Sequence, residues 1–404
     1  MAEKAQKTKK LSTEPYKGVR DFYPADMAVQ DFIFDTWKKT AESFGYEEYG
    51  ASVLEPAELY RNKTSEEIVN QQTYTFTDRG EREVTLRPEI TPSVARMVAA
   101  KKRELVFPLR WYSIPNLYRY EQPQRGRIRE FWQLNVDLFG VDSVEADIEV
   151  ISLAYQVMKN FGAKDSDFEI RINSRNLIRK IFEEKLKDEA DLGKAVRLLD
   201  RREKMKPGEF DAAMKELTKG PVDLAISPNE EVNKILVNLQ KLGISNARFD
   251  STLARGFDYY TGIVFEIFDT NPANRRALFG GGRYDDLTSL FGGDKIPAVG
   301  FGMGDVTIRD WLETRNLLPK PKVLADYYIC VMTENEAPFA EKLAQDLRDK
   351  GSRVAVDFTY KKIGDQIKGA DKRGIQNVIV IGPEEAKSGK VKVKNLISGE
   401  EKAL

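Results

Sequence analysis

The chain contains no histidine and one cysteine, Cys330, among its 404 residues. A lone cysteine cannot form an intramolecular disulfide, and without histidine the cysteine-and-histidine sites that hold zinc are excluded. Catalysis by Ser-His-Asp or Cys-His groups is excluded for the same reason. The fold must therefore be stabilised by a hydrophobic core, and the length suits two or three domains of about 150 residues each.

The sequence shows no sign of membrane insertion or secretion. No apolar run is long enough to span a bilayer, and residues 1–10 are polar and lysine-rich without the apolar stretch of a signal peptide. A single cysteine suits a reducing compartment. We therefore expect a cytoplasmic protein with no membrane partner, whose residues 1–15 form a disordered basic tail.

The charges cancel overall, at 64 basic and 64 acidic side chains, but they are unevenly distributed. Residues 79–129 carry twelve Arg and Lys against five Glu, a net charge of +7, whereas residues 130–149 carry six acidic residues and no basic one. Solvated helix faces are the ordinary explanation of such a run. Here many of the arginines lie among proline, glycine and aromatic residues, which favours an anion-binding region.

The first part of the chain is rich in predicted strands. A helical period is expected over 26–44, and strands are expected over 84–87, 109–120 and 131–139. The last of these alternates with a period of two, which places one set of polar side chains on a single face. That set is Gln133, Asn135 and Asp137. A polar face of this kind commonly lies against water, unless its neighbours give it another role.

The later parts of the chain change character twice. Residues 176–242 are dominated by Lys, Glu, Leu and Ala, and the helices expected there are separated at 206–208 and 219–221, which indicates a helical insertion. Strand character returns at 263–268. The prolines of residues 317–322 indicate a linker, and the alternating strands and helices beyond it predict a small α/β domain with a mostly parallel sheet.

Four short segments combine arginines with carboxylates on or beside the predicted strands. A buried arginine is costly without an anion because its guanidinium stays charged, and its planar shape suits phosphate. The usual phosphate-loop and dinucleotide-binding glycine motifs are both missing. The segments are Thr85-Leu-Arg-Pro-Glu-Ile-Thr91, residues 118–133, Leu253-Ala-Arg-Gly-Phe-Asp-Tyr-Tyr-Thr-Gly262 and Gly280-Gly-Gly-Arg-Tyr-Asp285.

These segments resemble the histidyl-tRNA synthetases, a class II aminoacyl-tRNA synthetase family, in order from Gly18-Val-Arg-Asp21 to the C-terminal domain. The resemblance implies an α+β fold: an antiparallel-sheet catalytic domain over 16–322 with a helical insertion at about 176–242, then a small α/β anticodon-binding domain over 323–404. It also implies ATP-dependent attachment of L-histidine to tRNA(His) through a histidyl-adenylate, with Mg²⁺ as a cofactor, and a homodimer formed through the stretch 18–56.

The resemblance assigns the phosphate-binding roles to arginines. Arg119 would bind the α-phosphate of ATP with Glu121 at the adenine end, and Arg255 would lie over the reacting phosphate, so that Arg119 and Arg255 are the predicted catalytic residues. Arg127 would reach the outer phosphates or the acceptor end of tRNA. The tRNA-binding residues implied by the resemblance are Gln124, Arg125, Lys361, Lys362 and Lys368. Solvated helix surface remains an alternative for each lysine.

The resemblance likewise implies the histidine-binding residues. Glu89, Thr91 and Gln133 would hold the α-amino group. The imidazole would be read by Asp137 and Tyr260, with Tyr259 and Tyr284 lining the pocket. Structural roles remain open for several of these positions: carboxylates paired with Arg87 or Arg119, tyrosines in the core, and a tight turn at residues 280–282.

One position departs from the family pattern. Thr307 stands where class II enzymes carry an arginine for the outer phosphates of ATP. The alternatives for its role are Arg309, Arg283 or Arg127, or a Mg²⁺ ion held by carboxylates such as Glu121 or Asp258. The departure keeps two non-catalytic alternatives open: a histidine-sensing regulatory subunit of ATP phosphoribosyltransferase, and a tRNA-binding module.

The absence of histidine has a further consequence. At a typical usage of about 2%, a chain of this length lacks histidine by chance with a probability on the order of 10⁻⁴. An enzyme that charges tRNA with histidine but contains none can be translated when charged histidine tRNA has run out. We therefore hypothesise that its synthesis does not depend on its product.

Overall fold

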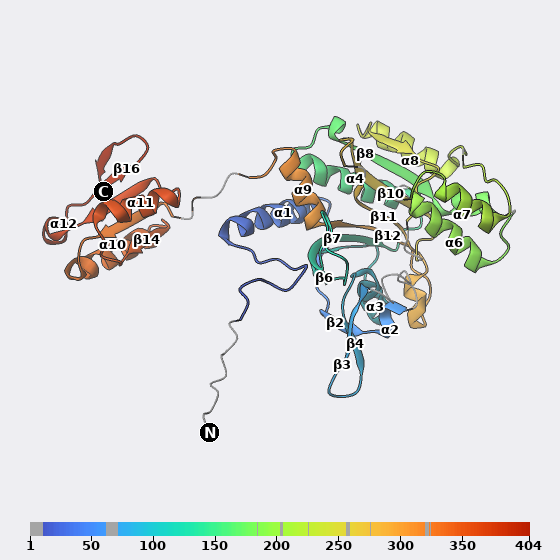
Figure 1. Cartoon of the computed structure of the whole chain (residues 1–404), viewed down its shortest axis with the longest axis horizontal. Coiled ribbons are helices and arrows are strands. Elements are labelled where there is room, and N and C mark those ends of the chain that lie inside the picture. The colour runs from blue at the N-terminus through green and yellow to red at the C-terminus, as the bar shows by residue number, and fades with distance from the viewer. Residues whose placement is uncertain are drawn as a thin grey trace, which may run out of the picture. The chain divides into compact units, whose positions relative to one another are not determined.

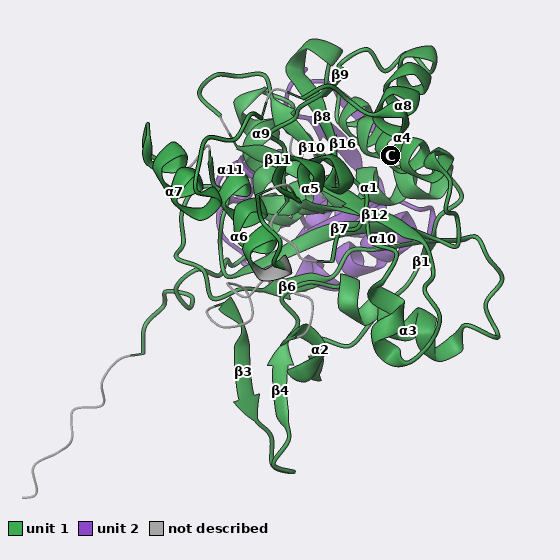
Figure 2. Ribbon diagram, turned by 90° about the vertical axis from the view of Figure 1, so that its right-hand side faces the viewer, with its two compact units in different colours: residues 1–319 green, residues 320–404 purple. Residues whose placement is uncertain are grey.

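The chain divides into two compact units, residues 1–319 and 320–404 (Figures 1 and 2). The computed structural model describes residues 11–61, 72–183, 185–202, 205–224, 226–255, 259–274, 276–319, 323 and 325–404. Most of the predicted basic tail and residues 320–322 of the predicted linker lie outside these ranges. No helix within them is long and apolar enough to cross a membrane.

A nine-stranded sheet forms the centre of unit 1 as described. Its neighbouring strands are antiparallel except for the outermost pairs, β1 with β5 and β8 with β9, which are parallel. The spatial order is β1 (Glu47–Glu48), β5 (Leu109–Ser113), β7 (Glu130–Phe139), β12 (Ala298–Gly304), β11 (Ala277–Arg283), β10 (Ile263–Asp269), β8 (Phe168–Ser174) and β9 (Ala247–Phe249), with β6 (Asn116–Tyr118) also paired to β7.

Four helices cover one face of this sheet (Figure 1). They are α1 (Pro24–Ser43), α4 (Val144–Asn160), α8 (Glu230–Lys241) and α9 (Asp305–Thr314). The apolar side of β7, with Leu134, Val136 and Leu138, is buried in the same core as Trp37 of α1 and Trp311 of α9. Because side chains alternate along a strand, the polar side of β7 lies on the opposite face of the sheet.

The opposite face carries a second core beside α3 (Thr91–Lys101), in which Val94 and Val98 pack with Val264 and Tyr284. A three-stranded sheet of β2 (Leu54–Pro56), β4 (Glu83–Leu86) and β3 (Tyr74–Thr77) adjoins this side, next to the short helix α2 (Glu58–Arg61). Its β3–β4 hairpin projects from the body of the unit (Figures 1 and 2).

The helical segment has a small core of its own. In α5 (Arg175–Glu183), α6 (Glu189–Asp200) and α7 (Glu209–Thr218), side chains such as Phe182, Leu199 and Phe210 pack with one another. The helix α8 instead contributes Val232 and Ile235 to the main core. The breaks predicted at 206–208 and 219–221 fall between α6 and α7 and between α7 and α8.

Unit 2 is a small α/β domain. Three of its strands, in the order β14 (Val354–Asp357), β13 (Tyr327–Val331) and β15 (Asn377–Ile381), are parallel, and β16 (Lys392–Asn395) and β17 (Glu401–Ala403) continue the sheet antiparallel. Helix α10 (Ala337–Asp349) and the short α12 (Pro383–Ser388) pack on one face. Helix α11 (Ile363–Lys372) packs on the other.

The predicted α+β fold class is confirmed, with an antiparallel catalytic sheet followed by a small α/β domain. One local prediction needed correction. The single run 109–120 is two strands, β5 and β6, separated at Ile114 and Pro115. The alternative of a tight turn at 280–282 is excluded, because these glycines lie within β11 in the middle of the sheet.

Candidate active site

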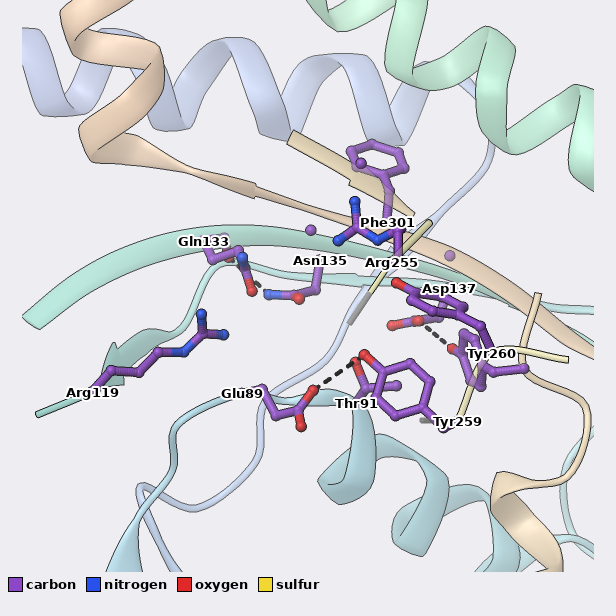
Figure 3. A pocket seen from close by; sticks show the side chains of 14 residues that line it. Glu89, Thr91, Arg119, Gln133, Asn135, Asp137, Arg255, Tyr259, Tyr260 and Phe301 are labelled. Atoms are coloured by element: carbon purple, nitrogen blue, oxygen red, sulfur yellow. Dashed lines mark hydrogen bonds between the residues drawn. The ribbon is translucent and has the colours of Figure 1, made fainter. Parts of the chain in front are cut away.

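A cavity of about 120 Å³ opens on the polar side of β7 (Figure 3). Its walls come from β7, β11, β12, the start of α3 and the segment around residue 255, which are far apart in the sequence. The lining residues are Glu89, Thr91, Arg119, Gln133, Asn135, Asp137, Arg255, Tyr259, Tyr260, Gly280, Tyr284, Gly300, Phe301 and Gly302. Both predicted catalytic arginines and all seven predicted histidine-binding residues therefore line one cavity.

Glycines on two adjacent strands form the floor of the cavity. Gly280 of β11 pairs with Gly302 of β12, and Gly282 pairs with Gly300. A Cβ atom on Gly300 would lie 2.5 Å from Oδ1 of Asp137, and one on Gly302 would lie 2.8 Å from the side-chain amide carbon of Gln133. Since real Cβ atoms do not approach so closely, side chains at these positions would close the space above the sheet.

Asp137 lies at the bottom of the cavity and is 3% exposed. The Tyr284 hydroxyl donates a hydrogen bond to its Oδ1 atom, while Oδ2 is buried and has no hydrogen-bond partner among the described residues. Burial raises the pKa of Asp137 to about 7. The site therefore holds one unused acceptor whose charge changes near neutral pH.

The carboxylate of Glu89 lies on the opposite wall, directly before α3. It accepts a hydrogen bond of 3.2 Å from the Tyr259 hydroxyl, and the Tyr60 hydroxyl donates to the Glu89 backbone oxygen. Burial raises the pKa of Tyr259 well above its usual range, so its hydroxyl remains a donor. Thr91 begins α3 and lines the same wall.

Arg87 binds no carboxylate in the part of the chain that the structure describes. It is 5% exposed, and its guanidinium donates to the backbone oxygens of Ala51, Ser52 and Asn116 and to Oδ1 of Asn116. This arrangement answers the question of whether Arg87 pairs with Glu89: it instead holds together the backbone segments that flank the residue pair 88–89. The neighbouring Pro88 oxygen accepts a 2.9 Å hydrogen bond from Nε of Arg119.

The two predicted catalytic arginines reach the cavity from different elements (Figure 3). Arg119 follows β6, and its guanidinium lies 5.2 Å from the centre of the Phe131 ring. Arg255 is held from the other side by a 2.9 Å ion pair with Glu266 of β10. The cavity thus has a cationic group at two points of its wall, which suits a phosphate or carboxylate ligand.

The residues considered as replacements at Thr307 do not line this cavity. Thr307 itself lies in the first turn of α9. Arg309 makes a 2.5 Å ion pair with Asp26 and faces a separate hollow, lined by residues including Arg20 and Glu313. Arg283 is buried and pairs with Asp147, so its role is structural.

The loop after β6 also lies outside the cavity lining. Arg127 is exposed and lies 3.8 Å from the carboxylate of Glu121, and Arg125 makes a 2.8 Å ion pair with Asp310 of α9. Gln124 accepts a hydrogen bond from Arg276. In unit 2, Lys361, Lys362 and Lys368 are exposed around the first two turns of α11.

Two residues of the site were missed in the sequence. Asn135 lines the cavity between Gln133 and Asp137, and its Nδ2 donates to the backbone oxygen of Gln133. Its place on the polar face of β7 was a sufficient signal. Glu266, the ion-pair partner of Arg255, is the one charged side chain within the apolar run 263–268.

The described residues contain no group of three or more Asp, Glu or Cys side chains able to hold a metal ion. Glu121 is paired with Arg127, and Asp258 lies outside the described residues. The two carboxylates at the cavity, Glu89 and Asp137, each accept a hydrogen bond from a tyrosine hydroxyl. Neither Glu121 nor these two carboxylates therefore belongs to a group of that size among the described residues.

The antiparallel sheet, its glycine floor and the two arginines define the catalytic unit of a class II aminoacyl-tRNA synthetase. Family models agree with this class and narrow it. The model of histidyl-tRNA synthetase matches residues 18–206 and 204–305, and the model of the anticodon-binding domain matches residues 326–404. The chain belongs to the histidyl-tRNA synthetase family.

Curated relatives cover nearly the whole chain. A histidine–tRNA ligase of Leptospira biflexa is 41% identical, with 97% of this chain and 95% of the relative covered, and one of Halobacterium salinarum is 37% identical over 95% and 94%. Among solved structures, the apo histidyl-tRNA synthetase of S. aureus matches with a TM-score of 0.75 at 26% identity, over 97% of each chain.

A structure from Bacillus halodurans C, described as an ATP phosphoribosyltransferase regulatory subunit/histidyl-tRNA synthetase, matches with a TM-score of 0.71. It is 24% identical and covers 92% of this chain, with 99% of its own chain matched. At this identity the likeness shows the fold alone. The relatives of higher identity support the enzyme rather than the regulatory subunit.

Proposed function

We propose that the chain joins L-histidine to tRNA(His) in two steps, using ATP and passing through a histidyl-adenylate. The observation that carries this proposal is that one cavity is lined both by two arginines and by Asp137 with three tyrosines. Histidine would lie at the Asp137 end. The α-phosphate of ATP would lie between Arg119 and Arg255.

The first step brings together two anions, the histidine carboxylate and the α-phosphate of ATP. Their repulsion must be offset, and they must be held in line for attack. Arg119 and Arg255 approach from different parts of the chain and supply charge-assisted hydrogen bonds for both purposes. No general base is needed, because the attacking carboxylate is already ionised. Pyrophosphate leaves, and histidine becomes bonded to AMP.

In the second step the terminal ribose hydroxyl of tRNA attacks the carbonyl carbon of the adenylate, and AMP departs. The hydroxyl proton can pass to the adenylate phosphate, since the cavity contains no histidine. Glu89, Thr91 and Gln133 would hold the α-amino group of the amino acid throughout. All three line the cavity that Asp137 also lines, Glu89 and Thr91 at the start of α3 and Gln133 on β7.

Selectivity for histidine follows from hydrogen bonding at the imidazole. The unused Oδ2 atom of Asp137 accepts from one ring N–H, and a tyrosine hydroxyl, that of Tyr260, serves the other nitrogen, with Tyr259 and Tyr284 enclosing the ring. An apolar side chain of similar size would leave these groups unpaired. Such a mismatch costs several orders of magnitude in kcat/KM at sites built to bind a polar substrate.

Other parts of the assignment complete the proposal. Mg²⁺ would enter with ATP, held mainly by the phosphates, because Mg²⁺ commonly keeps waters and phosphate ligands. Glu121 would contact the adenine end of ATP, and Arg127 the outer phosphates or the acceptor end of tRNA. Gln124 and Arg125 would bind tRNA, and Lys361, Lys362 and Lys368 would contact its anticodon arm. The protein would act as a cytoplasmic homodimer.

The test is ATP–pyrophosphate exchange with each of the twenty amino acids, repeated with Arg255→Ala. We expect exchange with histidine alone, and its loss in the variant. Histidine binding without exchange would instead support the regulatory subunit. Exchange unchanged in Arg255→Ala would remove the proposed role of this arginine.

A further inference from the structure

We propose that Glu266 is a positioning residue that fixes the Arg255 guanidinium above Gly280, at the place where the α-phosphate is attacked. The proposal rests on the role of Arg255 given under Proposed function and adds the group that orients it. Glu266 does not line the cavity, so it acts through Arg255 and not on the substrate.

The sheet register places these groups in one row. Glu266 of β10 pairs with Gly280 of β11, Gly280 pairs with Gly302 of β12, and Gly302 pairs with Asn135 of β7. Side chains of directly paired residues lie on the same face of a sheet. The row therefore runs from Glu266 under the cavity to Asn135, and both of its central members are glycines.

Arg255 crosses this row from above. Its Nη1 atom lies 2.9 Å from Oε1 of Glu266, and a Cβ atom built on Gly280 would collide with the same Nη1 atom and lie 2.8 Å from Cγ of Glu266. The ion pair thus spans the bare backbone of Gly280. Only glycine at this position leaves room for the guanidinium to lie against the sheet.

The pair is shielded from solvent, which makes it a strong restraint. The side chains of Arg255 and Glu266 are 14% and 18% exposed. The Arg255 guanidinium also lies 5.6 Å from the centre of the Tyr260 ring, and its Nε atom is buried with no hydrogen-bond partner among the described residues. Glu266 and Tyr260 therefore restrict a long side chain that would otherwise sample many rotamers.

A fixed guanidinium matters most in the transition state. The charge on the α-phosphate must meet donors that are already in place, and a displacement of about 1 Å can cost on the order of 100-fold in rate. Loss of Glu266 would leave the positive charge of Arg255 in the cavity, but the orientation of its guanidinium would no longer be restrained. We therefore expect a loss in kcat and little change in KM for histidine.

The experiment is a double-mutant cycle in histidine-dependent ATP–pyrophosphate exchange, with Glu266→Gln, Arg255→Lys and the double variant. We expect Glu266→Gln to lower kcat about 100-fold and to have almost no additional effect in the Arg255→Lys background. Histidine binding, measured by calorimetry, reports whether each variant is folded. Should Glu266→Gln fail to fold, Glu266→Asp, which keeps the charge on a shorter side chain, replaces it in the cycle.

The matched control is Glu149→Gln. Glu149 of α4 also forms a partly buried ion pair with an arginine, Arg110 of β5, but neither residue lines the cavity or pairs with Arg255 or Glu266. The positioning role is wrong if Glu266→Gln has no larger effect on kcat than this control. It is also wrong if the fold-decrease in kcat of the double variant equals the product of the decreases in the two single variants. If Arg255→Lys itself leaves exchange unchanged, the failure lies in the proposed function instead.

Discussion

The Tyr284 hydroxyl donates a hydrogen bond to Oδ1 of Asp137, and the other carboxylate oxygen faces the cavity without a partner among the described residues. This arrangement separates two tasks. Tyr284 fixes the orientation of the carboxylate, and Oδ2 remains for a ligand. Because burial raises the pKa of Asp137 to about 7, the same group links stability to pH.

Asp137→Asn should change the pH dependence of stability. With its pKa raised from 3.8 to about 7, Asp137 holds a proton in the folded protein that it loses in the unfolded chain between these values. Without bound histidine, the free energy of unfolding of the wild-type protein should therefore fall relative to that of Asp137→Asn as pH rises from about 4 to about 7. The expected decrease is on the order of 4 kcal/mol. Urea unfolding at several pH values measures the difference, and parallel profiles would contradict the shift.

Gly302→Ala should weaken histidine binding. The new methyl group would meet only the side chain of Gln133 within 3 Å, so the sheet can persist while Gln133 is displaced from the position proposed to hold the α-amino group. We expect KM for histidine to rise roughly 10-fold, the loss of about one hydrogen bond. Gly304→Ala, where a methyl group meets nothing within 4 Å, is the control on the same strand. Equal effects of the two substitutions would show that the floor is not required.

Arg87→Ala should destabilise unit 1 and disturb Arg119 indirectly. The substitution leaves buried backbone oxygens without their donor, which we expect to cost about 3 kcal/mol of unfolding free energy in urea. Arg110→Ala removes the Arg110–Glu149 ion pair, which is about one-third exposed, and should cost about 1 kcal/mol or less. An Arg87→Ala variant as stable as Arg110→Ala would refute the structural role of this guanidinium.

Lys361 and Lys362, which directly precede α11, and Lys368 within it should affect tRNA binding and not amino-acid activation. Replacing Lys361, Lys362 and Lys368 by alanine is expected to raise KM for tRNA and to reduce the salt dependence of its binding by up to about 0.9 per phosphate contact. ATP–pyrophosphate exchange should be unchanged. The control set consists of three exposed lysines: Lys342 of α10, Lys350 directly after α10, and Lys387 of α12. These two helices lie on the opposite face of the sheet from α11. The same loss in both sets would indicate only a general effect of charge.

Synthesis of the protein should continue during histidine starvation. The chain has no histidine codon to stall at, so its translation does not require charged tRNA(His). Pulse labelling after histidine withdrawal should show a constant rate for this protein while most synthesis declines. A variant with several histidines at exposed positions is the matched control, and an equal decline of both proteins would refute the hypothesis.

Much of the fold could be predicted from periodicity. The strand β7 was expected within one residue of its observed start, and α1 was predicted because apolar residues recur at helical spacing. The strand β8 was not predicted. Its sequence, Phe-Glu-Ile-Arg-Ile-Asn-Ser, alternates polar and apolar residues as a strand does. The strand is short and lies between two helices, α4 and α5, so the alternation was not recognised.

The site could be predicted less completely, because contacts across a sheet are not visible in one strand. The periodicity of β7 identified the polar face that carries Asp137. Whether this face meets water or a ligand could be decided only from the family resemblance. The glycines of β11 were open to interpretation as a turn, since their function depends on Gly300 and Gly302 lying beside them. The partnership of Arg255 and Glu266 likewise requires the register of β10 and β11.

The glycine floor also limits how the binding pocket can be redesigned. The depth of the pocket is set by the main chain of two central strands. No substitution on these strands can deepen the pocket, because glycine is already the smallest residue. Space for a larger histidine analogue must therefore be made in the aromatic wall, at Tyr259, Tyr260 or Tyr284. A library that varies these three positions and leaves the strands intact is the rational route to charging tRNA with unnatural imidazoles.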